Sequence, residues 1–330
     1  MGETILVTGS TGFIGRRLLR HSSLAGETLR VFLRPGSPRR EMDAGVEAVS
    51  GGFDDPLALK RAVRGVDRII HLAGVTKAVD DAAFDGGNVL PVQNLLAAVR
   101  EHNPGLKRFV LVSSLAAAGP ASAGYPGVVE SEVPHPVSAY GRSKLRGEEA
   151  ALRFAGDIPV TILRPPAVYG PGDRDVLQVF QMLSKGFLIS AGNARRQRFS
   201  MIHVDDLIRG IMMAARSDIA AGRIYNITSS GPWSWDDVVA AARIALGVQR
   251  VFRVSLPAPA VMLLGTLAGA AASLAGKASI LNRDKALELL QDYWVSSPRR
   301  AAEELGFTAG ISPEAGVTGT IAWAREQGFL

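Results

Sequence analysis

The sequence predicts an α/β protein with a doubly wound parallel sheet and a smaller, interleaved C-terminal portion. Three observations lead to this prediction. Short apolar runs alternate with helical stretches up to about residue 170, a glycine-rich turn joins the first run to the first helix, and 47% of the 330 residues are apolar. Apolar runs separated by helices are typical of a parallel sheet that helices cover on both faces.

The expected strands are short runs rich in valine, leucine and isoleucine. They lie at 4–7, 29–33, 46–49, 68–72, 108–112 and 160–163, and 224–227 is expected to return to the same sheet. Apolar positions at three- and four-residue spacing predict helices at 13–24, 56–63, 85–102 and 138–154. After residue 170 the pattern loosens, and helices are expected at 175–184, 204–216, 234–246 and 282–291.

The turn from Thr8 to Gly15 follows the first apolar run directly and opens the first helix. Its glycines suit a tight turn, a close approach of backbone to a pyrophosphate, and close packing of helix on strand. Backbone amides at such a helix start face the anion. This position favours a dinucleotide site over a glycine-rich surface turn, even in a chain with 36 glycines. The residues assigned to the site are Gly9, Thr11, Gly12, Phe13, Ile14 and Gly15.

The chain accordingly divides by pattern into two parts, although no linker marks a boundary. Residues 1–170, with return segments near 200–230, are expected to form the dinucleotide-binding domain. Residues 171–330 are expected to form the substrate-binding portion.

Tyr140 and Lys144 stand one helical turn apart, so both can project from one helix face toward a common point. A nearby cation favours phenolate, so we expect Lys144 to lower the pKa of the phenol from about 10 toward the neutral range. A strand that ends in Ser113 and Ser114 places hydroxyls where open α/β sheets present their ligand sites. These residues predict acid-base chemistry beside the dinucleotide, with strand capping as the alternative role of the serines.

These motifs resemble the extended branch of the short-chain dehydrogenase/reductase family, which includes NAD-dependent epimerases and dehydratases. In that family a TGxxGxxG turn, a strand-end serine and a Tyr-x-x-x-Lys pair recur in this order. The resemblance implies a Rossmann sheet, an NAD(P)-dependent oxidoreductase, and a homodimer formed through helices 85–102 and 138–154. It covers most of the chain, in segments 8–15, 71–74, 88, 113–119, 140–144, 164–171 and 202–207.

The resemblance also implies roles in catalysis. Tyr140 is the general acid/base, Lys144 lowers its pKa and binds the nicotinamide ribose, and Ser114 hydrogen-bonds the reacting oxygen. Ser114 is preferred to Ser113 because it stands five residues before Gly119, as the family's catalytic hydroxyl does before its own glycine.

Further contacts to the cofactor are implied around these residues. They involve Leu72, Ala73 and Gly74 after the fourth strand, and Pro165, whose backbone would lie with Arg164 beside the nicotinamide. Asn88 would hold a water or the helix backbone near the site, with a surface or capping role as the alternative. His71 and His203 are expected to be satisfied structural histidines.

Arg34 stands where an NAD-selective site places a carboxylate for the ribose 2′-hydroxyl. A guanidinium cannot accept that hydrogen bond but can pair with a 2′-phosphate, so NADP is expected, with NAD as the alternative. Arg39 and Arg40 would add to the same pocket or line a solvated loop. The third strand ends in 51–53 without the family's acidic residue, and neither Asp54 nor Asp55 is assigned to the adenine.

The substrate is expected to be a largely apolar secondary alcohol or ketone. Sugar-nucleotide members usually carry Asn and an Arg-Asp pair where this chain has Ala167 and Phe199-Ser200, which removes groups that would engage a diphosphate. The run over 164–170 instead resembles the 3β-hydroxysteroid dehydrogenase and dihydroflavonol reductase side. The alternatives are a nucleotide-sugar epimerase or dehydratase that retains NAD, and a noncatalytic NADP sensor. A phosphate contact for the epimerase could come from Arg195, Arg196 or Arg198.

Composition excludes several other classes. The chain has no cysteine, and its five histidines lack metal-ligand spacing, so no metal site is expected. A net charge of +6 without a basic stripe does not favour nucleic acid, and the polar start favours the cytoplasm. The uncharged segment 254–276 suits an apolar pocket and is expected to form a helix over the substrate side rather than span a membrane, with peripheral membrane contact as the alternative.

Overall fold

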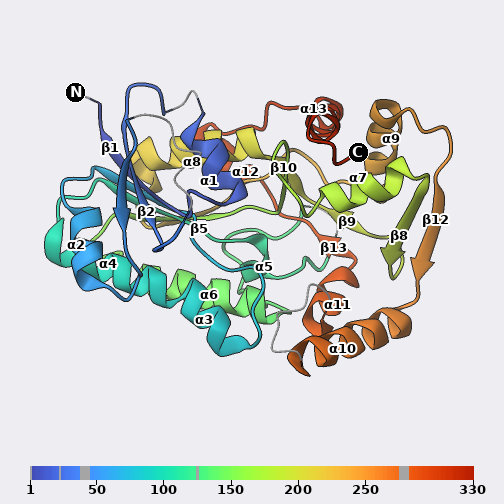
Figure 1. Cartoon of the computed structure of the whole chain (residues 1–330), viewed down its shortest axis with the longest axis horizontal. Helices are drawn as coiled ribbons and strands as arrows, with labels where there is room; N and C mark the ends of the chain where they lie inside the picture. The colour runs from blue at the N-terminus through green and yellow to red at the C-terminus, as the bar shows by residue number, and fades with distance from the viewer. Residues whose placement is uncertain (1, 22–23, 38–44, 124–125, 275–281) are drawn as a thin grey trace.

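The computed structural model describes residues 2–21, 24–37, 45–123, 126–274 and 282–330. Within these residues, one seven-stranded parallel sheet has the order β11-β6-β5-β4-β1-β2-β3 (Figure 1). This arrangement confirms the predicted α/β class. The strands are β1 (Thr4–Thr8), β2 (Thr28–Leu33), β3 (Glu47–Ser50), β4 (Arg68–His71), β5 (Arg108–Val112), β6 (Val160–Arg164) and β11 (Arg223–Asn226).

The strand order reverses between β1 and β4. From β1 the chain proceeds outward to β2 and β3, and it then crosses back to place β4 on the other side of β1. In open α/β sheets the crevice at the carboxyl ends of such strands receives the ligand. The strands after β4 continue to the opposite edge, where β11 pairs with β6, as expected for 224–227.

Helices cover both faces of the sheet, because successive residues of the central strands are apolar and point to opposite faces. In β1, Ile5 and Val7 belong to one core and Leu6 to the other. One layer contains α1 (Phe13–Leu19), α8 (Val204–Arg216) and α12 (Arg299–Leu305). The opposite layer contains α2 (Pro56–Val63), α3 (Asp81–Asn88), α4 (Leu90–His102) and α6 (Ala139–Leu152) (Figure 1).

The later part of the chain packs at one end of this sheet around a separate aromatic core that includes Tyr169, Phe180 and Trp233. Three parallel strand pairs belong to it: β7 (Ala167–Tyr169) with β10 (Met201–His203), β8 (Phe187–Ala191) with β12 (Phe252–Leu256), and β9 (Arg198–Phe199) with β13 (Tyr293–Trp294). Its helices are α7 (Leu177–Ser184), α9 (Trp235–Leu246), α10 (Ala258–Leu274), α11 (Arg283–Leu289) and α13 (Pro313–Glu326), while α5 (Leu115–Ala118) follows β5.

Three predicted element boundaries are wrong. The helix predicted at 85–102 is two helices that meet at Val89, because Pro91 cannot donate a backbone hydrogen bond and is tolerated only in the first turn of α4. The first helix ends at Leu19 instead of 24. The uncharged segment 254–276 begins inside β12, and its helix starts only at Ala258; residues 275 and 276 lie outside the described part.

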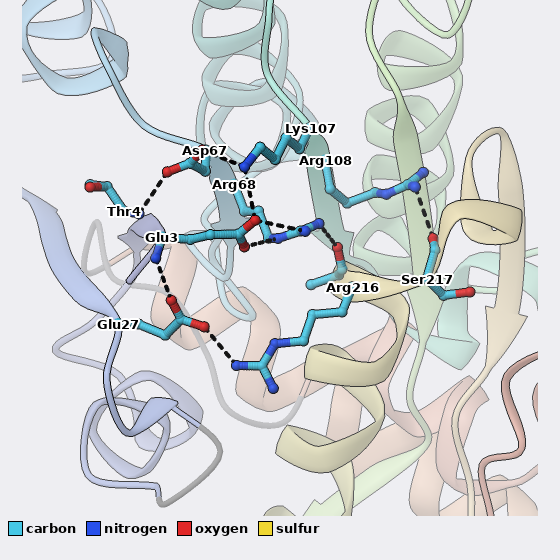
Figure 2. A network of polar contacts seen from close by, with 10 residues as sticks. Glu3, Thr4, Glu27, Asp67, Arg68, Lys107, Arg108, Arg216 and Ser217 are labelled. Carbon is cyan, nitrogen blue, oxygen red and sulfur yellow. Dashed lines mark hydrogen bonds and ion pairs between the residues drawn. The ribbon is translucent and has the colours of Figure 1, made fainter. Parts of the chain in front are cut away.

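Charged residues join the amino ends of the strands, on the edge opposite the crevice (Figure 2). The Arg68 guanidinium donates to both carboxylate oxygens of Glu3, at 2.5 and 3.1 Å, and also to the backbone oxygen of Ala215 in α8. Lys107 pairs with Glu3 and with Asp67. This network ties β1, β4 and β5 to the end of α8.

Candidate active site

The turn after β1 is built around two glycines that cannot be replaced without a clash. Gly9 has φ +71°, and a Cβ there would lie 2.6 Å from the backbone nitrogen of Ala73. A Cβ at Gly15 would lie 2.3 Å from the backbone oxygen of Gly9, so this glycine lets α1 pack directly on the turn. The backbone that follows β1 and β4 therefore has no side chain between the two segments, as the close approach of a dinucleotide requires.

The start of α1 also fits an anionic group. Its N-cap, Gly12, supplies no side-chain cap, and the first turn carries no acidic residue, so its amides remain for an anion. Thr11, Phe13 and Ile14 are partly exposed around this turn. The ring of Phe13 reaches across to Gly172 in the loop after β7, since a Cβ on that glycine would touch it at 3.3 Å.

The segment after β4 packs against the same glycine turn. The backbone amide of Leu72 donates to the backbone oxygen of Thr8, and that of Ala73 donates to the Thr8 hydroxyl at 3.3 Å. A Cβ at Gly74 would lie 3.4 Å from Nζ of Lys144. The structure thus brings 72–74 between the glycine turn and the predicted catalytic lysine.

Helix α6 presents Tyr140 and Lys144. It begins there because the Ser138 hydroxyl accepts from the amide of Gly141 as an N-cap. The ammonium of Lys144 is half-buried and donates to the backbone oxygen of Val112, at the carboxyl end of β5, at 3.2 Å. The predicted pair therefore lies at the carboxyl edge of the sheet.

The two serines that end β5 point in different directions. Ser113 is buried and donates to Oε1 of Glu148 at 2.5 Å. The Ser114 hydroxyl instead hydrogen-bonds the Tyr140 phenol and accepts from the amide of Ala116. Of the two hydroxyls, the one that the Gly119 spacing selected is the one beside the phenol.

The expected lowering of the Tyr140 pKa is contradicted by the structure. Burial raises the pKa of the phenol to about 12, the hydrogen bond from Ser114 opposes this rise, and the carboxylate of Glu288 adds to it. Burial also lowers the pKa of Lys144 to about 8, against the carboxylate of Glu148. Desolvation outweighs charge here because protein surrounds most of both groups, although each side chain keeps part of its surface exposed.

The resemblance implied that Arg164 lies beside the nicotinamide, but its guanidinium is buried and paired within the protein. It is 2% exposed and donates to Glu148 at 2.6 and 3.0 Å, so it forms a buried pair behind β5 and β6. The backbone oxygen of Pro165 accepts from the amide of Leu115, which fixes the turn after β6 to α5.

Asn88 is neither a capping residue nor a surface residue. Its amide exchanges two hydrogen bonds with the backbone of Val75 and donates to the hydroxyl of Ser143 at 2.9 Å. It therefore fixes the loop after β4 to α6, between Tyr140 and Lys144. His71 is only half satisfied, since its Nδ1 meets the Thr8 hydroxyl while Nε2 has no partner among the described residues.

The residues that bear on cofactor choice lie at the ends of β2 and β3. Arg34 is exposed directly after β2. Arg39 and Arg40 lie outside the described residues. The carboxylate of Asp55 accepts from the amides of Leu57 and Ala58, so it caps α2.

On the substrate side, three arginines are candidates for a phosphate contact, and two of them, Arg196 and Arg198, already have partners within the protein. Arg198 donates to the backbone oxygens of Arg195 and Gln197, and Arg196 pairs with Asp292 at 3.3 Å. Arg195 is exposed. The ring of Phe199 lies 5.2 Å from that of Trp235, which gives this region an aromatic lining.

Sequence reasoning missed three carboxylates that act on α6. Glu148 follows Lys144 by four residues, a spacing that places both on one helix face and could have revealed it. Asp284 accepts from the amide of Ala139 and Glu288 from the hydroxyl of Ser138, both at 2.5 Å. These two residues come from α11, which is distant from α6 in sequence. No sequence pattern near α6 therefore predicts their contacts with it.

Comparison with known proteins gives consistent matches. The family model described as "NAD dependent epimerase/dehydratase family" matches residues 5–228. "Ceramide reductase" of Caulobacter vibrioides (strain NA1000 / CB15N) is 32% identical over 329 residues, covering 99% of this chain and 96% of that protein.

Two further matches bear names that refer to different compounds. "2-alkyl-3-oxoalkanoate reductase" of Stenotrophomonas maltophilia (strain K279a) is 28% identical over 259 residues, covering 75% of this chain and 77% of that protein. The solved structure "MoeE5 in complex with UDP-glucose and NAD" is 25% identical, with a TM-score of 0.74 and 99% of each chain covered.

Proposed function

The chain belongs to the NAD-dependent epimerase/dehydratase family, and from this premise we propose that it transfers hydride between NADP(H) and a secondary alcohol or ketone of a largely apolar substrate. An NAD(P)-dependent oxidoreductase-type enzyme is what the family and its reductase, epimerase and dehydratase members support. The choice of NADP, the substrate class and the residue roles are the proposal.

One observation carries this proposal. The Ser114 hydroxyl contacts the Tyr140 phenol, and the Lys144 ammonium lies one helical turn away at the carboxyl end of β5. A proton donor, an orienting hydroxyl and a cation thus converge beside the glycine turn. A noncatalytic sensor would not require this arrangement.

In the reductive direction, Tyr140 donates its proton to the oxygen of the ketone while Ser114 holds that oxygen with a hydrogen bond. With a pKa raised to about 12, the phenol keeps its proton throughout the neutral range and is ready to act as an acid. The charge of Lys144 favours the phenolate that forms as the proton leaves. The bound nicotinamide would supply or accept the hydride.

An apolar substrate agrees with the groups around the site. Ala167 replaces the amide of sugar-nucleotide members, while Arg196 and Arg198 are engaged within the protein. Two of the reductases that resemble this chain bear the names of a ceramide and of an alkyl-oxoalkanoate, both with hydrocarbon chains. These likenesses favour a long-chain ketone over a sugar nucleotide.

Cofactor preference can be tested at Arg34. We expect Arg34→Asp to lose most of the preference for NADPH over NADH, because the guanidinium is the proposed partner of the 2′-phosphate. Dissociation constants for both dinucleotides measure this directly, with Arg30→Gln in β2 as control. An unchanged preference in Arg34→Asp would contradict the NADP assignment.

The rival function is a nucleotide-sugar epimerase or dehydratase, which the likeness to the UDP-glucose complex of MoeE5 favours. Denaturing the purified protein and identifying any released dinucleotide separates the two. Readily exchanged NADPH and turnover of long-chain ketones would support the reductase. Tightly retained NAD with conversion of a UDP-sugar would support the rival, and binding without turnover of any alcohol or ketone would support a sensor.

A further inference from the structure

Gln197 is a buried glutamine whose side chain connects two helices of the C-terminal portion. It stands directly before β9 and is 6% exposed. Its amide oxygen accepts from the indole of Trp235, the first residue of α9, at 2.8 Å. Its amide nitrogen donates to the backbone oxygens of Leu289 at 2.8 Å and of Gln291 at 3.4 Å, at the end of α11. The donor and the acceptor of this one amide are therefore engaged by different elements.

The end of α11 is held by side chains from outside the helix. A helix leaves its last backbone oxygens without helical partners, so other groups commonly satisfy them. The backbone oxygen of Glu288 accepts from the indole of Trp294 at 2.8 Å, and that of Leu289 accepts from Gln197. A helix of seven residues is too short to be stable without such contacts. Gln197 and Trp294 thus fix the end of α11 that carries Glu288.

The Glu288 carboxylate reaches the catalytic helix, since α11 lies between β13 and the start of α6 (Figure 1). It accepts from the hydroxyl of Ser138, the N-cap of α6, at 2.5 Å and from the ammonium of Lys285 at 3.0 Å. Ser138 stands two residues before Tyr140, and the negative charge of Glu288 raises the pKa of that phenol. The Glu288 side chain is only 12% exposed, so water screens its charge incompletely. The place of Glu288 therefore decides how strongly it acts on the phenol.

The orientation of the Gln197 amide is itself fixed. The ring of Trp235 packs 5.2 Å from that of Phe199, and its indole can meet only the oxygen side of the amide, which turns the nitrogen to α11. We propose that Gln197 is a positioning residue that holds α11, and with it Glu288, against the catalytic helix. This inference rests on the proposed function, in which Tyr140 is the acid. It adds a residue that acts through Glu288 and not on the phenol itself.

A double-mutant cycle tests the inference with the full chain. Gln197→Met keeps the length of the side chain and removes its hydrogen bonds. In the wild type we expect Glu288→Gln to raise kcat/KM for ketone reduction by about two- to fivefold. In Gln197→Met the same substitution should change kcat/KM by less than about 1.5-fold, because the carboxylate is no longer held beside α6. Gln181→Met removes a glutamine of α7 that donates to Phe329, and as the matched control it should keep the full gain.

Gln197→Glu separates positioning from packing. The carboxylate keeps the size of the side chain and the acceptor for Trp235, but it cannot donate to Leu289. This variant should therefore also lose the response to Glu288→Gln, and it replaces Gln197→Met if circular dichroism shows that Gln197→Met does not fold. A role in packing alone would lower the stability of these variants and leave the response to Glu288→Gln intact.

Amide hydrogen exchange gives a readout that needs no turnover. The amide of Ala139, in the first turn of α6, donates to Asp284 of α11 at 2.5 Å. Gln197→Met should raise the exchange rate of this amide by about fivefold or more, and Gln181→Met should leave it unchanged. If the wild type reduces no ketone, the proposed function fails, and this exchange rate still decides whether Gln197 holds α11 on α6.

Three results would overturn the inference. They are an unchanged exchange rate at Ala139 in Gln197→Met, the full gain from Glu288→Gln in that background, and the absence of this gain in a wild type that reduces ketones. The last would show that Glu288 has no effect on the reaction for Gln197 to position.

Discussion

At the scale of single residues, burial sets the protonation of the two central groups. The phenol of Tyr140 has its pKa raised to about 12, and the ammonium of Lys144 has its pKa lowered to about 8. Sequence spacing correctly placed the two in one helix, one turn apart, whereas the preference for Ser114 over Ser113 came from the family pattern and stays a prediction. It could not give the direction of the phenol pKa, because the enclosure of Tyr140 depends on elements that are distant in sequence.

The pKa of Lys144 predicts an alkaline limit on activity. A lysine with a lowered pKa is charged below that value and neutral above it, so the ammonium is lost as pH rises through about 8. We expect kcat/KM for ketone reduction to be level below this pH and to fall above it. Lys144→Met should be much slower and should lack this limb, whereas a wild-type profile that stays level through the same range would refute the role.

Arg164 illustrates what sequence cannot give at this scale. The family pattern placed it beside the nicotinamide, but its guanidinium is enclosed with Glu148 behind the sheet. Its partner comes from a different element, and only the packing of α6 on β6 brings them together. The sequence identified Arg164 as part of the family pattern, but it did not predict Glu148 as its partner.

At the scale of elements, α11 connects the C-terminal portion to the catalytic helix. Asp284 and Glu288 both accept hydrogen bonds from the first residues of α6, but only Glu288 affects the pKa of Tyr140. Its negative charge raises that pKa by disfavouring phenolate. Asp284 thus anchors the start of α6, whereas Glu288 both anchors it and raises the pKa of Tyr140.

Glu288→Gln keeps an acceptor for Ser138 and removes the charge. Because the phenol becomes a stronger acid, we expect kcat/KM for reduction at neutral pH to rise by about two- to fivefold. Asp284→Asn changes the neighbouring anchor on the same helix and serves as the control, with no such rise. If Glu288→Gln slowed the enzyme as much as a disrupted anchor would, the electrostatic role would be wrong.

The charge network at the amino ends of the strands predicts a stability effect that is separate from activity. Partners Arg68 and Lys107 hold the pKa of the Glu3 carboxyl below its usual range. A carboxyl with a depressed folded-state pKa stabilises the fold above its unfolded pKa, and this contribution is lost as pH falls through the folded value.

We expect Glu3→Gln to lower the free energy of unfolding by about 1 kcal/mol at neutral pH, and the difference from wild type to shrink in acid. Urea denaturation at neutral pH and at acidic pH measures both effects. Glu47→Gln, which alters a more exposed pair with Arg30, should cost less than about 0.5 kcal/mol. Equal losses in both variants, or a loss independent of pH, would rule out the network as the cause.

At the scale of the whole molecule, the sheet was predictable because each strand is a local apolar run and because the glycine turn identifies its first crossover. The break at Val89 and the late start of α10 were not, since both occur at prolines inside apolar segments whose periodicity continues across the break. The division at residue 170 and the homodimer through α4 and α6 stay predictions. Among the described residues, no helix is both long and apolar enough to cross a membrane.

The proposed function depends on proton transfer by Tyr140, which can be tested by single-turnover ketone reduction in Tyr140→Phe with bound NADPH. Tyr225→Phe, which removes a phenol that donates to Glu304 away from the site, is the control. We expect Tyr140→Phe to bind NADPH normally and to reduce the ketone about 10² to 10⁴ times more slowly. Reduction at the wild-type rate would show that Tyr140 does not transfer the proton.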